Sequence, residues 1–231
     1  MTSRYAIYFA PRRHSPWWTF GTSWLGRDEF TGEPMTQPAV HGLDAQALRA
    51  AIADPARYGF HATLKAPFRL GAGVTAERLL RRMRHWALGQ RAVPLGLIVP
   101  LYMDGFVALT PTRPDSALQA LAAACVTEFD DLRAPLTQAQ RERRRIAPDD
   151  ARGLELFERY GYPHVLERFR FHMSLTGSVD TRVAGQVVAQ VARPVAQLNE
   201  REPLVVDRLC VFLEREPGAP LRRVADVELP V

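Results

Sequence analysis

The amino-acid sequence predicts an α+β fold in which small antiparallel sheets are backed by helices. Segments with strand-like and helix-like patterns alternate along the 231 residues. The order strand, helix, hairpin also occurs twice, starting at Phe60 and again at Phe169. A repeated order of this kind indicates two related structural halves, each with its own sheet. We therefore expect a single bilobal domain over 1–231, with lobes of about 1–110 and 111–231.

The first half contains strand and helix signals in a clear order. Apolar runs bounded by turn residues predict strands at 4–11 and 58–68, and helical spacing predicts helices within 42–59 and 75–90, the latter capped by Thr75. Residues 93–111 are predicted to form two strands joined at Asp104-Gly105, a favoured hairpin turn. Residues 12–40 are rich in aromatic residues, Gly and Pro without a steady periodicity, which predicts a long loop.

The second half begins with helices and ends with a hairpin. Residues 115–133 form a strongly amphipathic helical pattern, and shorter helices are expected within 136–146 and 148–163. The remaining elements are a strand at 168–177, a helix at 180–198 with Asp180 as its N-cap, and a hairpin at 203–230 around "PGAP".

The composition is that of a folded protein with an excess of positive charge. The net charge of +5 favours anionic partners such as phosphates, nucleotides or nucleic acid, although arginines on solvated helix faces account for much of it. Cys125 and Cys210 lie in apolar segments and are expected to be buried core residues rather than a disulfide framework. The N-terminal segment lacks a signal-peptide pattern, and no apolar stretch reaches membrane-spanning length. We therefore expect a cytoplasmic protein without membrane contact.

The pattern Phe-His-x-Thr/Ser-Leu occurs twice, as "FHATL" and as "FHMSL". Residues two apart in a strand point to the same face, so each stretch has an apolar back and a polar front. The front of the first stretch contains His61, Thr63 and Lys65. The front of the second contains Arg168, Arg170, His172, Ser174 and Thr176. Two such faces would border a positively charged cleft.

This set of side chains suits chemistry on a phosphate ester. Imidazole exchanges protons near neutral pH, so two histidines can act as base and acid in one displacement, such as attack of water on a phosphodiester. Hydroxyls and cations can bind the phosphate oxygens. We predict that His61 and His172 are catalytic. The predicted substrate-binding residues are Thr63, Ser174, Lys65, Arg168, Arg170 and Thr176.

The two motifs resemble the paired H-x-[T/S] signature of the 2H phosphoesterase superfamily. With "RYAIYFAP", "WLGRD", "RYGFHATLKAPFRL" and "RFRFHMSLTG", essentially the whole chain resembles the bacterial branch associated with carbon–phosphorus lyase and phosphonate metabolism. The resemblance implies a bilobal 2H phosphoesterase-like fold, with two pseudo-symmetric antiparallel sheets flanked by helices around a central cleft. It also implies a metal-independent hydrolase without a cofactor. Its expected substrate is a small cyclic phosphate, namely a ribose 1,2-cyclic phosphate bearing a 5-phosphate.

Other functions stay open at this point. An RNA-processing 2H enzyme would act on 2′,3′-cyclic phosphates or 2′-5′ linkages, and a non-catalytic phosphate-binding module would use the same residues. A metal site is disfavoured because ligands with recognisable spacing are missing from the sequence. G-x-S-x-G and G-x-x-x-x-G-K-[ST] motifs are also missing, which disfavours a serine hydrolase and a nucleoside-triphosphate hydrolase.

Two further segments have competing interpretations. The cationic run Arg141–Arg145 is more typical of a solvated helix face, so nucleic acid is a possible partner that is not favoured. The aromatic segment from Trp17 to Trp24 would be either a lid over the site or a cover for the core, and the structural role is favoured. The sequence does not fix the oligomeric state or say which histidine is the acid.

Overall fold

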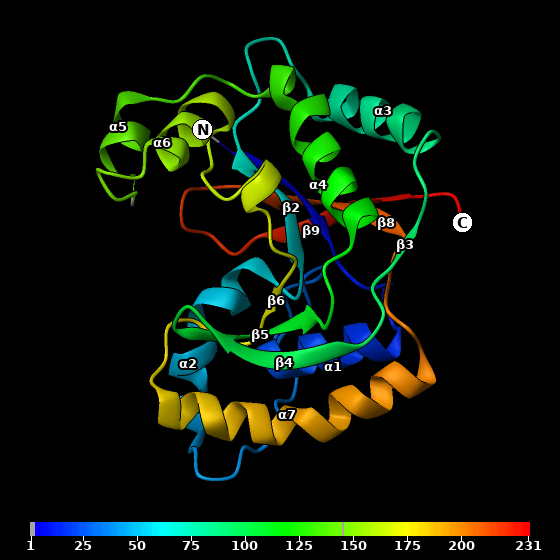
Figure 1. Cartoon of the computed structure of the whole chain (residues 1–231), viewed down its shortest axis with the longest axis vertical. Coiled ribbons are helices and arrows are strands. Elements are labelled where there is room, and N and C mark those ends of the chain that lie inside the picture. Colours follow the sequence, from blue (N-terminus) through cyan, green and yellow to red (C-terminus); the bar gives the residue numbers. More distant parts are fainter. Residues whose placement is uncertain (1–2, 145) are drawn as a thin grey trace.

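Three antiparallel sheets organise the chain in the computed structural model, which describes residues 3–144 and 146–231 (Figure 1). The strands are β1 (Arg4–Phe9), β2 (Ala62–Phe68), β3 (Val93–Pro94), β4 (Ile98–Met103), β5 (Phe106–Pro111), β6 (Met173–Ser174), β7 (Val205–Val206), β8 (Arg208–Glu214) and β9 (Arg222–Glu228). The helices are α1 (Pro16–Leu25), α2 (Ala45–Tyr58), α3 (Ala76–Ala87), α4 (Ser116–Glu128), α5 (Gln138–Glu142), α6 (Ala151–Tyr160) and α7 (Thr181–Arg201). The chain also forms two 3-10 turns, η1 (Asp130–Leu132) and η2 (Leu166–Arg168).

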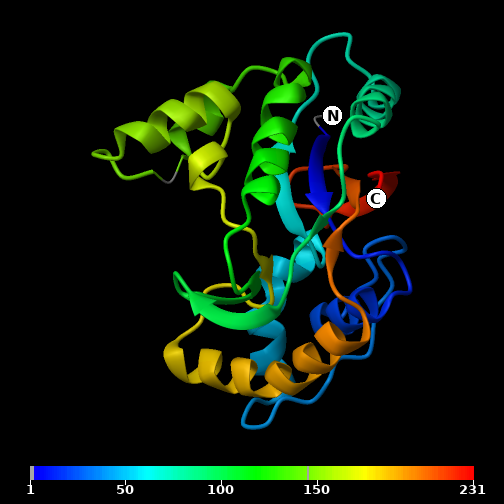
Figure 2. The ribbon, with the colours of Figure 1, turned by 45° about the vertical axis from the view of Figure 1, so that its right-hand side comes forward.

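The two larger sheets occupy different parts of the molecule. The four-stranded sheet has the order β2-β1-β8-β9 and lies in the upper part of Figure 1, where α3 and α4 pack on it. The three-stranded sheet has the order β4-β5-β6 and lies in the lower part, where α7 packs against β4 and β5. The view in Figure 2 shows the same two parts, joined by several crossing segments. The predicted α+β class with antiparallel sheets is therefore confirmed.

Both sheets combine strands from the two halves of the sequence. β1 pairs with β2 on one side and with β8 on the other, and β5 pairs with β6. The sheets therefore do not divide at residue 110, where the sequence repeat placed the boundary between lobes. The predicted hairpins are present, because β4 and β5 join at Asp104-Gly105 and β8 pairs with β9. Asp104 and Gly105 have φ angles of 49° and 91°, as a type I′ turn requires.

Helix α1 lies in the segment that was predicted to be a loop. Ser15 accepts a hydrogen bond from the Trp18 N–H, Pro16 occupies the first turn, and Gly26 ends the helix at φ 70°. The helix is apolar on most of its circumference, so it lacks the amphipathic period by which helices are recognised. Trp17 and Trp24 are each 1% exposed, which confirms the structural role that was favoured for this aromatic segment.

The strand predicted at 168–177 is much shorter in the structure. Only Met173 and Ser174 pair with β5, and Arg168 belongs to a 3-10 turn that begins at Leu166, a residue with φ 53°. The predicted starts of two helices are confirmed, because Thr75 caps α3 and Asp180 caps α7. No helix among the described residues combines the length and apolar character that a membrane crossing needs.

Candidate functional site

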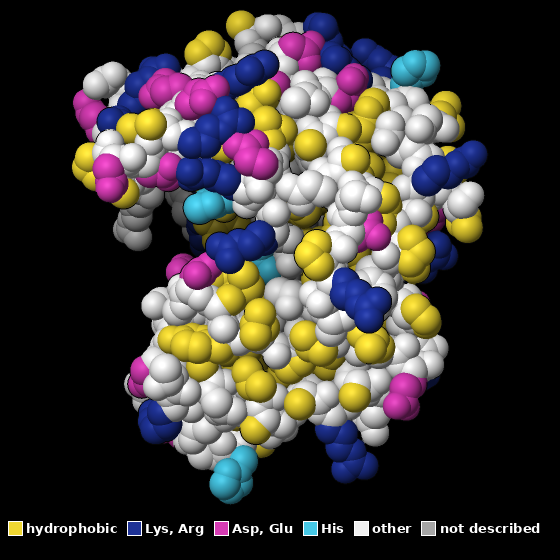
Figure 3. Space-filling model, viewed as in Figure 1, with side chains coloured by type: hydrophobic (Ala, Val, Ile, Leu, Met, Phe, Trp, Pro, Cys, Tyr) yellow, Lys and Arg dark blue, Asp and Glu magenta, His cyan; other side chains and the backbone are white. Residues whose placement is uncertain are grey.

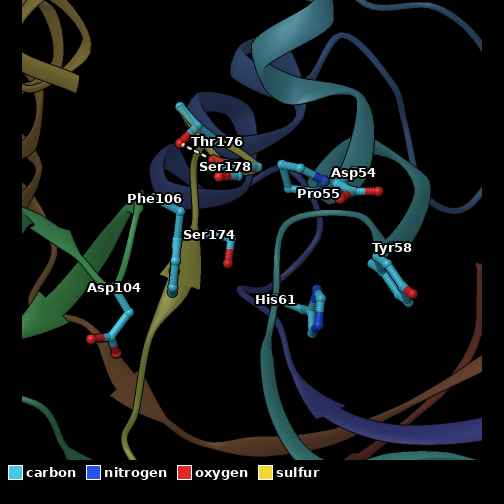
Figure 4. Close-up of a pocket in the computed structure, with 10 residues that line it drawn as sticks. Asp54, Pro55, Tyr58, His61, Asp104, Phe106, Ser174, Thr176 and Ser178 are labelled. Atoms are coloured by element: carbon cyan, nitrogen blue, oxygen red, sulfur yellow. Dashed lines mark hydrogen bonds between the residues drawn. The ribbon is translucent and has the colours of Figure 1, made fainter. Parts of the chain in front are cut away.

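A continuous cleft contains both histidine motifs. Three adjoining cavities of about 320, 460 and 220 Å³ form it, and the smallest links the other two through His61, Thr63, His172 and Ser174. Figure 3 shows the hollow at the left edge of the molecule, bordered by basic, acidic and histidine side chains. In Figure 4, His61 and Ser174 lie on opposite sides of one of these cavities. The predicted convergence of the two motifs is therefore present.

His61 is positioned by the connection between α2 and β2. Gly59 ends α2 with φ 86°, a conformation that favours glycine, and its carbonyl oxygen lies 2.8 Å from His61 Nδ1. Because that oxygen can only accept, Nδ1 carries the hydrogen. The other ring nitrogen, Nε2, lies 3.2 Å from Thr63 Oγ1. The ring stacks on Tyr8 of β1, with centroids 3.8 Å apart, which fixes its plane.

His172 is held in the same way on the other side. Its Nδ1 lies 2.7 Å from the carbonyl oxygen of Arg170, which is two residues earlier, as Gly59 is for His61. The imidazole meets the Phe106 ring edge-on at a centroid distance of 5.6 Å. Each histidine therefore has Nδ1 occupied by its own backbone, which leaves Nε2 as the nitrogen available for proton exchange.

Burial makes both imidazoles poor bases. Desolvation lowers the pKa of His61 from 6.5 to about 4, with a smaller contribution from the charge of His172. Desolvation also lowers the pKa of His172, and Arg170 and His164 lower it further. Both rings are therefore neutral at pH 7. A charge on His172 would disfavour protonation of His61, which places the two rings within electrostatic reach across the cleft.

The hydroxyl residues differ in their availability. Thr63 and Ser174 both line the cleft, as predicted. Thr176 also borders it, but its side chain is buried and accepts a hydrogen bond from the Val107 N–H while donating to the Gly177 carbonyl. The hydroxyl of Thr176 therefore supports the backbone between β5 and β6.

Lys65 does not share the face of His61, so that expectation is wrong. Tyr8 pairs with Thr63 while Ile7 pairs with Lys65, so Leu64 is an extra residue that forms a bulge in β2. The bulge breaks the alternation of faces. Lys65 is 3% exposed, and its Nζ donates to the carbonyl of Val126 at 2.9 Å and to Asp130 at 3.0 Å.

The two predicted arginines line the cavity beside His172 but have different partners. Arg168 makes two hydrogen bonds to Asp150, at 2.7 and 2.5 Å. Arg170 makes one bond of 2.8 Å to Asp104, and both of these side chains are mostly exposed. Thus Arg168 is fixed, whereas Arg170 can exchange its partner.

Sequence reasoning missed several residues that complete the cleft. Tyr58 closes α2 beside His61, and Tyr162 and His164 follow α6. Asp104 lies in the turn between β4 and β5, and Phe106 begins β5. These residues come from elements far apart in the sequence and carry no shared spacing. For Tyr58 alone the sequence offers a signal, because this residue lies in "RYGFH", directly before the first histidine motif.

Other reactive groups lie outside the cleft. Cys125 and Cys210 are buried, and burial raises the pKa of Cys125 to about 12 and that of Cys210 still further above its usual value. Among residues 3–144 and 146–231, no group of three or more His, Cys, Asp or Glu side chains is arranged to hold a metal ion. Of the cationic run Arg141–Arg145, Arg145 lies outside the described residues, and Arg141 pairs with Glu158 on the surface.

Two curated proteins are similar to this chain along nearly all of its length. One, from Janthinobacterium sp. (strain Marseille), is 41% identical over 221 residues, which is 94% of this chain and 49% of that protein. The other, from Laribacter hongkongensis (strain HLHK9), is 36% identical over 220 residues, or 95% of this chain and 50% of that protein. Both are named "Ribose 1,5-bisphosphate phosphokinase PhnN". The chain thus spans about half the length of the curated relatives that it matches.

These names contradict the predicted activity. A hydrolase that opens a cyclic phosphate was expected, whereas both relatives are named as a kinase. The predictions of a cyclic phosphodiesterase and of a hydrolase are therefore corrected. The expectation of a phosphorylated ribose as ligand agrees with the sugar in the relatives' name.

A family model matches residues 63–222, which include Thr63, His172 and Ser174 and begin two residues after His61. The matched region covers more than half of the chain, including strands of both larger sheets. This chain therefore belongs to the family described as "Protein of unknown function (DUF1045)".

Proposed function

We propose that the cleft binds a phosphorylated ribose of the ribose 1,5-bisphosphate class, with His61 and His172 exchanging protons at a phosphate group. The observation that carries this proposal is the convergence of two imidazoles, each with Nδ1 fixed by the carbonyl two residues earlier. Ser174 adds a hydroxyl donor beside them, and the Thr63 hydroxyl contacts Nε2 of His61. A phosphate oxygen placed between the rings would accept hydrogen bonds from both sides of the cleft.

The electrostatics of the cleft support an anionic ligand. Arg170 places a positive charge beside His172, and this charge adds to burial in lowering the pKa of that ring. A bound phosphate would reverse this effect and favour the protonated imidazoles, because an opposite charge stabilises the charged form. The histidines thus become hydrogen-bond donors when the ligand binds.

We further propose that this chain supplies the site for the sugar phosphate, while phosphoryl transfer by the named relatives uses the part of those proteins that this chain does not span. Lys65, the only lysine of the chain, is held in an ion pair behind the sheet. The placement of one motif on each of the two larger sheets supports a bilobal arrangement with approximate symmetry. A role in phosphonate metabolism belongs to the same proposal.

Isothermal titration calorimetry of the purified chain tests this function. Ribose 1,5-bisphosphate and ribose 5-phosphate should bind, whereas unphosphorylated ribose should not. His61→Ala and His172→Ala should each weaken binding about ten- to hundred-fold, since a hydrogen bond to a charged group contributes roughly 1.5–3 kcal/mol.

The matched control is His85→Ala, because His85 is exposed on α3 and does not border the cleft. This variant should bind like the unmodified chain, and circular dichroism should show that all three variants are folded. Failure of both phosphorylated riboses to bind would refute the proposal. Binding that survives loss of both histidines would also refute it.

A further inference from the structure

We propose that the cavity beside His172 is a second phosphate subsite, in which Arg170 and His164 hold a phosphate that displaces the carboxylate of Asp104. This inference rests on the proposed function, because it assigns the two phosphates of one ligand to two ends of the cleft. The cavity measures about 460 Å³ and continues into the histidine site through Thr63 and His172. A ligand bound between the histidines therefore reaches it without crossing protein.

The charges in this cavity favour an anion. Arg168 and Arg170 are the next largest causes, after burial, of the lowered pKa of His164, and Arg170 has the same effect on His172. Asp150 and Asp104 raise the pKa of His164, but their effect is smaller than that of the arginines. The positive potential of the arginines is thus only partly neutralised by the carboxylates that pair with them.

The two arginines have separate roles. Arg168 is fixed by two bonds to Asp150, and Asp150 also caps α6 through the Gly153 N–H at 2.9 Å. Arg168 therefore orients the segment that leads to His172. Arg170 makes a single bond to Asp104, with the two side chains 66% and 60% exposed. Exposed ion pairs of this kind contribute little free energy, so an incoming phosphate can replace the carboxylate.

Asp104 is placed to compete with the ligand. It lies in the turn between β4 and β5 with φ 49°, and it borders both the cavity at His61 and the cavity at His172. A phosphate monoester carries up to two negative charges and can bind a guanidinium through two oxygens, whereas Asp104 offers one charge and one bond. The exchange therefore favours the phosphate and selects ligands with two phosphates.

The test is the ratio of the dissociation constants of ribose 5-phosphate and ribose 1,5-bisphosphate, measured by calorimetry. The unmodified chain should prefer the bisphosphate by about tenfold or more. In Arg170→Ala this ratio should fall to a value between about 1 and 2, because the second phosphate of the bisphosphate then has no subsite to bind. Asp104→Asn should raise the ratio about two- to fivefold, since it removes the competing carboxylate.

Arg152→Ala is the matched control, because Arg152 is a neighbouring surface arginine paired with Glu155 and Glu167 outside the cleft. Its ratio should equal that of the unmodified chain. An unchanged ratio in Arg170→Ala would overturn the subsite while leaving the proposed function intact. Failure of the unmodified chain to bind either ribose phosphate would instead overturn the proposed function.

Discussion

His61 combines a fixed hydrogen bond with a strongly lowered pKa. Its Nδ1–H donates to the Gly59 carbonyl, and its ring stacks on Tyr8 inside the cleft. The pKa of His61 is about 4 in the folded protein and 6.5 for an ordinary histidine. The folded state therefore binds fewer protons than the unfolded state between these two values, and the protein loses stability as the pH falls through this range.

We predict that His61 accounts for a measurable share of this acid sensitivity. At pH 5 the unfolded histidine is mostly protonated and the folded one is not, which costs about 1–2 kcal/mol relative to pH 7. Urea denaturation should show a smaller loss of stability between pH 7 and pH 5 for His61→Gln than for the unmodified chain. His85→Gln, on the exposed face of α3, should show the same loss as the unmodified chain. An identical loss in His61→Gln would mean that the ring is not desolvated.

At the scale of elements, the bulge in β2 decides which side chains reach the cleft. His61 and Thr63 precede the extra residue Leu64 and face the cleft, whereas Lys65 follows it and enters the space under α4. The ammonium group there bonds to the Val126 carbonyl and to Asp130, which also pairs with Arg133. Lys65 thus links β2 to the end of α4.

We predict that Lys65→Met lowers stability and leaves ligand affinity unchanged within about twofold. The variant leaves the Val126 carbonyl unpaired, at a cost of about 1–3 kcal/mol, while Asp130 keeps Arg133. Thr63→Val is the matched change on the cleft side of the same strand and should weaken ribose phosphate binding with little effect on stability. Chemical denaturation and calorimetry separate the two outcomes. Reduced affinity in a Lys65→Met protein of normal stability would place Lys65 at the ligand.

The sequence was sufficient where structure depends on near neighbours. Residues two positions apart in a strand point to the same face, and this local rule correctly predicted that Thr63 lines the cleft with His61 and that Ser174 lines it with His172. Alternation failed at Lys65, where the register depends on pairing with β1. It also failed at Arg168, where the chain turns after Leu166. Helix α1 was not predicted because it is buried around most of its circumference, so its sequence lacks the alternation of apolar and polar residues that marks a helix with one exposed face.

At the scale of the whole molecule, the site depends on strands that are distant in sequence. β1 lies between β2 and β8, so the start and the end of the chain form one sheet under His61. The other motif is carried by β6, which pairs with β5 from the first half of the chain. Trp24 of α1 also donates a 2.8 Å hydrogen bond to the Leu175 carbonyl, next to Ser174. Each histidine is therefore supported by both halves of the sequence.

We predict that neither half folds alone. In a fragment of residues 1–110, β1 would lose β8 and β5 would lose β6, which exposes unpaired backbone groups and the buried side chains of Ile7 and Leu109. Circular dichroism should show no cooperative thermal transition for 1–110 or for 111–231. Mixing the two fragments from denaturant should restore a cooperative transition and ribose phosphate binding. A fragment 1–110 that melts cooperatively by itself would show that the sequence repeat defines independent lobes, despite the shared sheets.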